Sequence, residues 1–373
     1  MSRKNSKGLS RRAFLRLTAA GAVGLTTIPT IIVPRRTEAF DGSTVHPNIS
    51  PLRVVGVRDP RMTNPVELRT GWAQEEKLVN WDPVQEDMDR LACGLAEESS
   101  PADAWKKIFL KPAGKSWSDV VVAIKINRLG VQRTRSAVLA KVCHAFTDVV
   151  GAKGSNVYVF DGCTGGGMAS QDRYQGLPQG VTLADQWGGY NLKAAVPAPY
   201  GDGQRQAPCL DHLVKGEVDI LVNIALCKGH GSEFGGFTMC MKNHFGTFSP
   251  NPSHGPGGGA DYMIGINRAP EILGPVDPQT GNVIFPRQQL CIVDALWASR
   301  PGPGEPSDSQ PNVILMGTFP PVVDYLGAMR LRKDVMHWPV NEQITARLLS
   351  DFGYSERDLP NGGRIIDVTP QAG

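Results

Sequence analysis

The sequence predicts an α/β fold with a largely parallel sheet, helices on both faces and long Gly/Pro-rich loops. Over residues 118–373, short apolar runs typical of buried strands alternate with segments whose apolar residues recur at helical spacing. Such alternation favours parallel strands that are joined by helices. Two long connections rich in Gly and Pro, at 163–210 and 250–288, interrupt the pattern. Loops of this length usually bind or cover a ligand.

Each expected element follows from its local pattern. Apolar runs predict strands at 119–127, 156–162, 218–226, 289–296, 312–317 and 364–368. Helical spacing predicts helices at 83–99, 101–110, 134–150, 321–333 and 341–353. In 134–150, Val138, Val142 and Val149 line one face, and Gly151 is a natural helix end. Because the strand pattern begins near residue 118, residues 40–117 are expected to form a variable region that packs on an α/β core at 118–373.

Charge and cysteine content exclude several classes of protein. The net charge is only +3, and the first 36 residues contain basic but no acidic residues, so the remainder is slightly acidic. We therefore expect no nucleic-acid partner and no anionic membrane partner. The seven cysteines are scattered singly without a CxxC pair. That pattern is not a disulfide framework and contains no iron–sulfur cysteine motif.

The first 39 residues are expected to be a signal peptide. SRRAFLR (10–16) precedes an uncharged run of 17 residues, and small residues at 37–39 suit a cut before Phe40. Arg11 and Arg12 followed by Phe14 and Leu15 resemble a twin-arginine signal. The alternative is an uncut membrane anchor, but a short run rich in Gly, Ala and Thr favours removal. The twin-arginine machinery would then be a partner, the protein would be periplasmic, and no membrane contact would remain.

Polar side chains gather where the predicted strands end. Lys125 and Asn127 end the first strand of the core, Asp161 the second and Asp294 the fourth, while Lys228 and His230 follow the third. In open α/β sheets, ligands bind beyond the carboxyl ends of the strands. We therefore expect these side chains to meet at one edge of the sheet.

The motifs around these residues resemble a known family. In order, they are IKIN (124–127), VFDG (159–162), LCKGH (226–230), MKNHFG (241–246), IVDAL (292–296) and PPVVDYLG (320–327). This succession resembles the domain of unknown function 362 over roughly residues 118–350. The resemblance implies shared core positions at Lys125, Asn127, Lys228, His230, Lys242 and Asn243. Some members carry ferredoxin-type cysteine clusters. This chain does not, and Ile126 and Leu226 stand where proline and lysine are common.

One short segment also suggests a metal ion. Within residues 227–246, Cys227 and His230 are spaced C-x2-H, and Cys240 and His244 are spaced C-x3-H. These are ligand types and spacings typical of structural zinc. The alternative is that the cysteines are small buried residues, as free cysteines usually are. A smaller site would combine His230 with His254 or an aspartate.

Two further chemistries use the same region. Lys125, Lys228 and Lys242 supply positive charge, and Asn127 and Asn243 supply amide donors, as an anion-binding pocket requires. Asp161, Asp294 and Asp324 are candidates to act with His230 as general bases or metal ligands. The alternative for Asp161 is a turn, and for Asp324 a helix start, since Asp is favoured in both places.

Two functions are consistent with these patterns. The first is a metal- or redox-cofactor-linked periplasmic enzyme with a Lys/His/Asn/Asp site at the strand ends. The export signal supports it, because twin-arginine substrates are exported folded and often carry a cofactor. The second is a cofactor-free periplasmic binding or assembly protein that recognises an anionic ligand, a carboxylate or a phosphate. An enzyme needs His230 and the aspartates as well as the lysines, whereas a binding protein needs the lysines.

Overall fold

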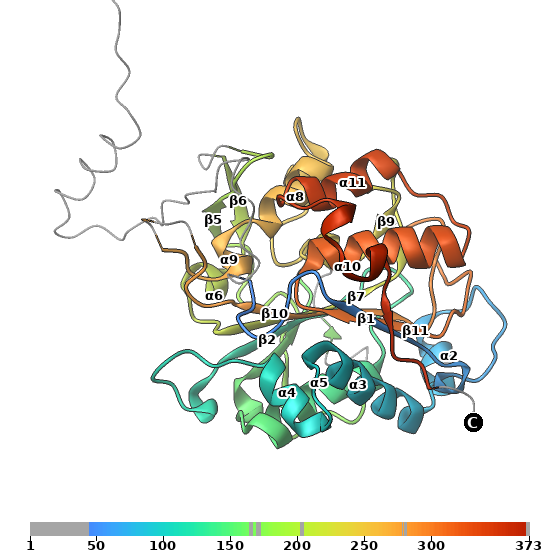
Figure 1. Cartoon of the computed structure of the whole chain (residues 1–373). Helices are drawn as coiled ribbons and strands as arrows, with labels where there is room; N and C mark the ends of the chain where they lie inside the picture. The colour runs from blue at the N-terminus through green and yellow to red at the C-terminus, as the bar shows by residue number, and fades with distance from the viewer. Residues whose placement is uncertain are drawn as a thin grey trace, which may run out of the picture. The chain divides into compact units, whose positions relative to one another are not determined.

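The computed structural model describes residues 45–163, 167–168, 173–201, 205–277, 279 and 282–370, so the predicted signal peptide lies outside the described part. An eight-stranded sheet has the order β12-β1-β11-β10-β7-β2-β3-β4 (Figure 1). Its strands are β1 (Val54–Arg58), β2 (Val122–Lys125), β3 (Val157–Phe160), β4 (Thr182–Leu183), β7 (Ile220–Leu226), β10 (Gln288–Ala295), β11 (Val313–Gly317) and β12 (Ile366–Asp367). β11 runs antiparallel to both of its neighbours, whereas the remaining pairs are parallel. The largely parallel α/β fold is confirmed.

Helices cover both faces of this sheet (Figure 1). On one face lie α3 (Trp81–Ala96), α4 (Pro101–Ile108) and α5 (Ser136–His144), which continues as a π-helical segment, Ala145–Val150. On the other face lie α7 (Cys240–Asn243), α8 (Ala260–Asn267), α9 (Pro270–Leu273), α10 (Pro320–Leu326) with its π-helical continuation η10 (Gly327–Val335), and α11 (Glu342–Ser350). Short elements complete the chain: α2 (Trp72–Glu75), α6 (Asp211–Val214), α12 (Pro360–Gly363) and the strand pairs β5 (Leu192–Ala195) with β6 (Gln206–Cys209) and β8 (Lys228–Gly229) with β9 (Phe237–Thr238).

Local sequence explains where these helices begin and end. The Ser100 hydroxyl accepts a hydrogen bond from the Asp103 backbone N–H at 3.4 Å and caps α4, with Pro101 in the first turn. After α5, Gly151 adopts a left-handed conformation with φ 85° and ends the helical segment. The strands of the sheet separate two cores, so that Ala123 packs in one core and Ile124 in the other.

The region before residue 118 contributes more to the fold than packing on the core. Its strand β1 inserts between β11 and β12, and α3 packs on β1. The sequence pattern missed β1 because VVGVR is short and contains Gly56. The glycine is required there, since a Cβ at position 56 would lie 2.7 Å from Ile365 Cγ2. No helix within the described residues has both the length and the apolar character needed to span a membrane.

The connections create a topological switch point beside β2. From β2 the chain passes through α5, on the α3 face, to β3. It then forms β4 at the edge of the sheet, returns through residues such as Ala194 and Leu213, which pack in the opposite core, and enters β7 on the other side of β2. In open α/β sheets the crevice beyond the carboxyl ends of such strands is the usual ligand site. The end of β2 and the end of β7 are therefore the places where a site is expected.

Candidate functional site

Lys125, the last residue of β2, is buried at this switch point and only 1% exposed. Its ammonium donates to the Ile126 carbonyl at 2.7 Å, to Asp161 Oδ1 at 3.1 Å and to Asn243 Oδ1 at 3.4 Å. An ammonium has three N–H donors, so all of them have acceptors within the protein. Lys125 therefore connects the ends of β2 and β3 to α7.

Asp161 is held from several directions. Besides Lys125, its carboxylate accepts hydrogen bonds from the backbone N–H of Arg128 at 2.8 Å and of Cys163 at 3.0 Å. The alternative for Asp161, a turn residue, is consistent with the second of these bonds, because an Asp side chain commonly bonds to the backbone two residues on. The carboxylate thereby serves as a buried counter-ion for Lys125.

The Lys228 ammonium also has an acceptor within the protein for each of its three donors. Its ammonium donates to Asn127 Oδ1 at 2.7 Å, to the Leu129 carbonyl at 2.6 Å and to the Gln132 carbonyl at 3.0 Å. Burial lowers the pKa of Lys228 to about 7, and the Asp161 charge opposes that shift. Lys228 therefore stabilises the loop after β2 through hydrogen bonds and has no N–H donor left for an anion. This differs from the predicted pocket, in which Lys125 and Lys228 were expected to bind the ligand.

Asn243 joins the two lysines at the centre of the network. Its Oδ1 accepts from Asn127 Nδ2 at 3.1 Å, while its Nδ2 donates to Asn223 Oδ1 at 2.8 Å. Asp324 fixes the helix that carries Asn243, because its carboxylate accepts from the backbone N–H groups of Cys240 and Met241 at 2.7 and 2.8 Å. Burial raises the pKa of Asp324 to about 7. Asp324 therefore positions α7.

Gly246 allows this network to close. A Cβ at this position would lie 2.7 Å from Asp161 Oδ1 and 2.8 Å from Lys125 Cε, and the backbone has φ 110°. Residues other than glycine rarely adopt a backbone conformation with a positive φ of this size. The glycine of the KNHFG segment is thus explained by its close approach to the Lys125–Asp161 ion pair.

Lys242 differs from the other two lysines. Its ammonium lies over two aromatic rings, 4.0 Å from the Phe245 centroid and 4.5 Å from the Phe234 centroid. The residue is 8% exposed, and no described residue forms a hydrogen bond or an ion pair with this ammonium. Burial lowers the pKa of Lys242 to about 8. Cation–π contacts compensate only part of the cost of burying a charge, so Lys242 is available for an anion.

His230 lies close enough to Lys242 for their charges to interact. Burial and the positive charge of Lys242 lower the pKa of His230 to about 3, so its imidazole is neutral at physiological pH. Its Nδ1 accepts a hydrogen bond from the Gly231 backbone N–H at 2.8 Å. Because one ring nitrogen of a neutral imidazole accepts and the other carries the proton, Nε2 is assigned as the N–H donor. His230 therefore offers a neutral donor beside the free ammonium.

Tyr190 supplies a second neutral donor, its hydroxyl, at the turn after β3. Its buried OH has no hydrogen-bond partner. A Cβ built on Gly162 would meet that hydroxyl at 2.5 Å, which places the hydroxyl against the turn that carries Cys163. Burial raises the pKa of Cys163 to about 12, although the positive charges of Lys125 and Lys242 oppose the shift. Cys163 is thus a thiol rather than a thiolate nucleophile.

The comparisons with known proteins place the chain in a family. A family model described as a domain of unknown function, DUF362, matches residues 122–329, which is more than half of the chain. The chain belongs to the DUF362 family. The match confirms the resemblance drawn from the motifs, and the Lys–Asn network and Lys242 lie within the matched residues. The search of curated proteins produced no match. The search of solved structures produced none either.

Asp294 of this DUF362 chain accepts hydrogen bonds outside the Lys–Asn network. Its carboxylate accepts from the backbone N–H of Arg135 at 2.9 Å and from that of Leu296 at 3.3 Å. Burial raises the pKa of Asp294, and the Arg135 charge opposes the shift. Arg135 is the residue that precedes α5 and forms a buried ion pair with Glu75 at 2.5 Å. Asp294 therefore positions the start of α5, and its two hydrogen bonds are not to the Lys–Asn network.

The four residues of the zinc-like pattern have other partners. Cys227 Sγ accepts from Arg332 Nη1 at 3.8 Å, and Cys240 Sγ donates to the Ile292 carbonyl at 3.6 Å. His244 Nε2 lies 2.5 Å from Gln288 Oε1 and 3.0 Å from Asn223 Nδ2. Within the described residues, no group of three or more His, Cys, Asp or Glu side chains is arranged to hold a metal ion. The structure does not bring these two Cys–His pairs together as a tetrahedral ligand set.

Sequence reasoning missed several residues of the Lys–Asn network. Asn223 is the main one, and the signal was a lone polar residue inside the apolar run ILVNIAL. Thr134 is another, since its Oγ1 accepts from the Asn127 backbone N–H at 3.1 Å. The Leu129 and Gln132 carbonyls had no signal, because a backbone acceptor leaves no mark in a sequence.

Proposed function

We propose that this DUF362 protein binds a small anion, a carboxylate or a phosphate, at Lys242, with the His230 Nε2–H and the Tyr190 hydroxyl as further donors. The observation that supports this most strongly is the Lys242 ammonium, which is nearly buried and forms no hydrogen bond or ion pair with a described residue. A buried charge without a partner is costly, and a bound anion removes that cost. The proposal corresponds to the binding-protein hypothesis, with one lysine in place of three.

The cofactor-linked enzyme has less support from the described residues. Cys227, Cys240 and His244 already have partners, while Asp294 and Asp324 hold backbone N–H groups at helix starts. Among the described residues, His230, Lys242 and Tyr190 have low exposure and a polar atom without a hydrogen-bond partner. These residues are sufficient for binding an anion and for donating a hydrogen bond to it.

Replacing Lys242 by Met is expected to weaken anion binding strongly and to leave the fold intact, because the ammonium has no hydrogen-bond or ion-pair partner among the described residues and loses only its contacts with the two aromatic rings. Thermal shift and isothermal titration calorimetry with acetate, succinate, inorganic phosphate and glycerol phosphate measure this. At least one probe should stabilise the wild type, and its affinity should fall at least ~10-fold in Lys242→Met, which corresponds to about 1.4 kcal/mol. Binding should also weaken as the pH rises through the pKa of the bound Lys242.

Two control variants separate binding from folding. Lys106→Met removes an exposed lysine of α4 and should bind like the wild type. Lys228→Met removes a lysine whose three donors are used inside the protein, so it should lower stability even without a ligand. If no probe stabilises the wild type, or if Lys242→Met binds as tightly as the wild type, the proposed function is wrong.

We also propose that residues 1–39 direct export to the periplasm by the twin-arginine route. The support is the pair Arg11–Arg12 before an uncharged run of 17 residues. Replacing both arginines by Lys should keep the full-length chain in the cytoplasm and uncut, whereas the wild type should be periplasmic and shorter. Cell fractionation and intact mass measure this, with Arg35→Lys/Arg36→Lys as the matched control. Identical distributions of wild type and the Arg11/Arg12 variant would contradict the assignment.

A further inference from the structure

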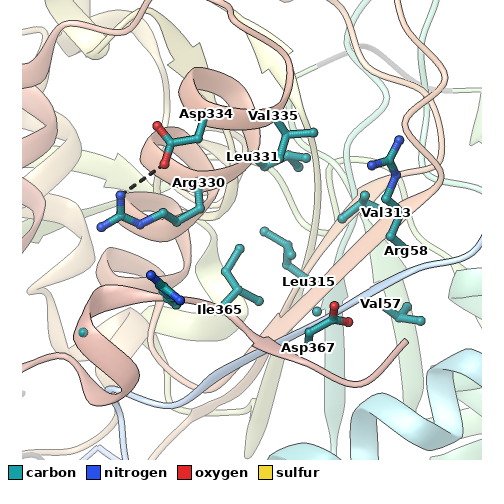
Figure 2. A pocket seen from close by; sticks show the side chains of 13 residues that line it. Val57, Arg58, Val313, Leu315, Arg330, Leu331, Asp334, Val335, Ile365 and Asp367 are labelled. Atoms are coloured by element: carbon teal, nitrogen blue, oxygen red, sulfur yellow. Dashed lines mark hydrogen bonds and ion pairs between the residues drawn. The ribbon is translucent and has the colours of Figure 1, made fainter. Parts of the chain in front are cut away.

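A cavity lies on the other side of β10 from the Lys242 site. It has a volume of ≈ 570 Å³ and lies between β1, β11, the helix η10 and the C-terminal segment (Figure 2). In the sheet, β11 and β10 separate β1 from the β7–β2 switch point. A volume of this size is typical of pockets for small organic molecules. The cleft is therefore a separate candidate site.

The cleft has an apolar lining. Leu315 from β11, Leu331 from η10 and Ile365 from the C-terminal segment border its middle in Figure 2. Val335 also lines it and is 49% exposed, which makes it one of few large apolar side chains exposed in the described part of the chain. An exposed apolar side chain at the rim of a concave apolar surface favours an apolar occupant.

The three guanidinium groups around this lining differ in their partners. Arg330 is engaged, since it pairs with Asp334 at 3.1 Å and with Glu356 at 2.6 Å. Arg58 and Arg364 also line the cleft, and no described residue forms an ion pair or a side-chain hydrogen bond with either guanidinium. Arg58 and Arg330 lie on opposite sides of the cleft in Figure 2. The remaining acidic lining residue, Asp367, accepts from the Thr369 backbone N–H at 2.8 Å.

These features specify the chemistry of a ligand. Guanidinium groups bind carboxylates and phosphates through paired hydrogen bonds, and such bonds strengthen beside an apolar surface. We propose that the cleft binds an amphipathic organic anion, with its apolar body on Leu315, Leu331 and Ile365 and its carboxylate or phosphate at Arg58 or Arg364. The proposal is independent of the Lys242 site, which offers one ammonium and two aromatic rings.

Calorimetry with the purified chain tests this proposal, using decanoate, decyl phosphate, decanol and acetate below their aggregation concentrations. Decanoate or decyl phosphate should bind, and the comparison of the two identifies the preferred head group. Decanol has the apolar body without the charge and should bind at least ~10-fold more weakly than decanoate. This difference in affinity corresponds to about 1.4 kcal/mol of binding free energy. Acetate has the charge without the body and should show no binding at this site.

Variants locate the site. Arg58→Gln and Arg364→Gln should each weaken decanoate binding several-fold, and the double variant should abolish it. Both side chains are exposed, so urea unfolding of these variants should match the wild type. Lys153→Gln, a change at another exposed residue, should leave decanoate affinity unchanged. The proposal is overturned if neither decyl anion binds, if decanol binds as tightly as decanoate, or if the double arginine variant retains full affinity.

Discussion

Replacing Asp161 by Ala is expected to lower the free energy of unfolding by about 3–5 kcal/mol, because the change leaves Lys125 as a buried charge without its counter-ion. Lys125 and Asp161 are each 1% exposed and lie 3.1 Å apart. The same change removes the acceptor for the Arg128 and Cys163 backbone N–H groups. Unfolding in urea, followed by circular dichroism, measures the loss.

Three further variants show whether the lost ion pair or the changed side-chain shape causes that loss of stability. Asp161→Asn keeps the shape and should lose less than Asp161→Ala. Lys125→Met combined with Asp161→Asn should be more stable than Asp161→Ala, because no unpaired charge remains. Glu98→Ala breaks a partly exposed ion pair with Lys107 and should cost less than about 1 kcal/mol. A loss in Asp161→Ala as small as that in Glu98→Ala would contradict the buried ion pair.

The sequence predicted the edge of the sheet at which polar residues meet, for a simple physical reason. A buried strand needs an apolar run, and the first polar residue after it marks the carboxyl end. Lys125 at the end of β2 and Asp161 just after β3 were found in this way, and the structure places them in contact. Lys228 follows β7 by the same pattern and bonds to Asn127 at 2.7 Å.

The sequence could not show which lysine is free. Sequence motifs do not distinguish Lys125, Lys228 and Lys242. The three lysines differ in whether the folded chain places hydrogen-bond acceptors around their ammonium groups. The loop after β2 turns the Leu129 and Gln132 carbonyls toward Lys228, whereas Lys242 projects over the Phe234 and Phe245 rings. Tertiary contacts of this kind depend on backbone paths that local patterns do not encode.

The zinc-like spacing is a case in which a local pattern predicted a ligand set that the structure does not bring together. Cys240 and His244 are four residues apart, as two ligands on one helix would be, yet each has a partner of its own in the protein. His244 lies against Gln288, a residue of β10 that no local pattern connects with it. Spacing restricts which residues can meet, but burial and neighbouring strands decide what they contact.

Acidification is expected to destabilise the fold through His230, and the sign follows from its pKa. The folded-state pKa is about 3 and the ordinary value is 6.5, so between these values the unfolded chain binds a proton that the folded chain does not. The stabilising contribution is present above pH 6.5 and is lost as the pH falls towards 3, by about 1.4 kcal/mol per pH unit. Between pH 6 and pH 4 we expect a loss of roughly 2.5 kcal/mol from this imidazole.

Comparison with His230→Gln isolates that contribution, because other groups shift the total in both directions. His244 has a pKa of about 3 and adds a loss of the same sign. Asp324 opposes it, since a carboxyl whose folded-state pKa is about 7 favours the folded chain at low pH and loses that effect as the pH rises through 7. The difference in unfolding free energy between wild type and His230→Gln, measured in urea at pH 6, 5 and 4, should therefore fall steadily by roughly 2.5 kcal/mol. A difference that stays constant would mean that His230 is accessible and titrates normally, and the neutral Nε2–H donor assigned beside Lys242 would then be wrong.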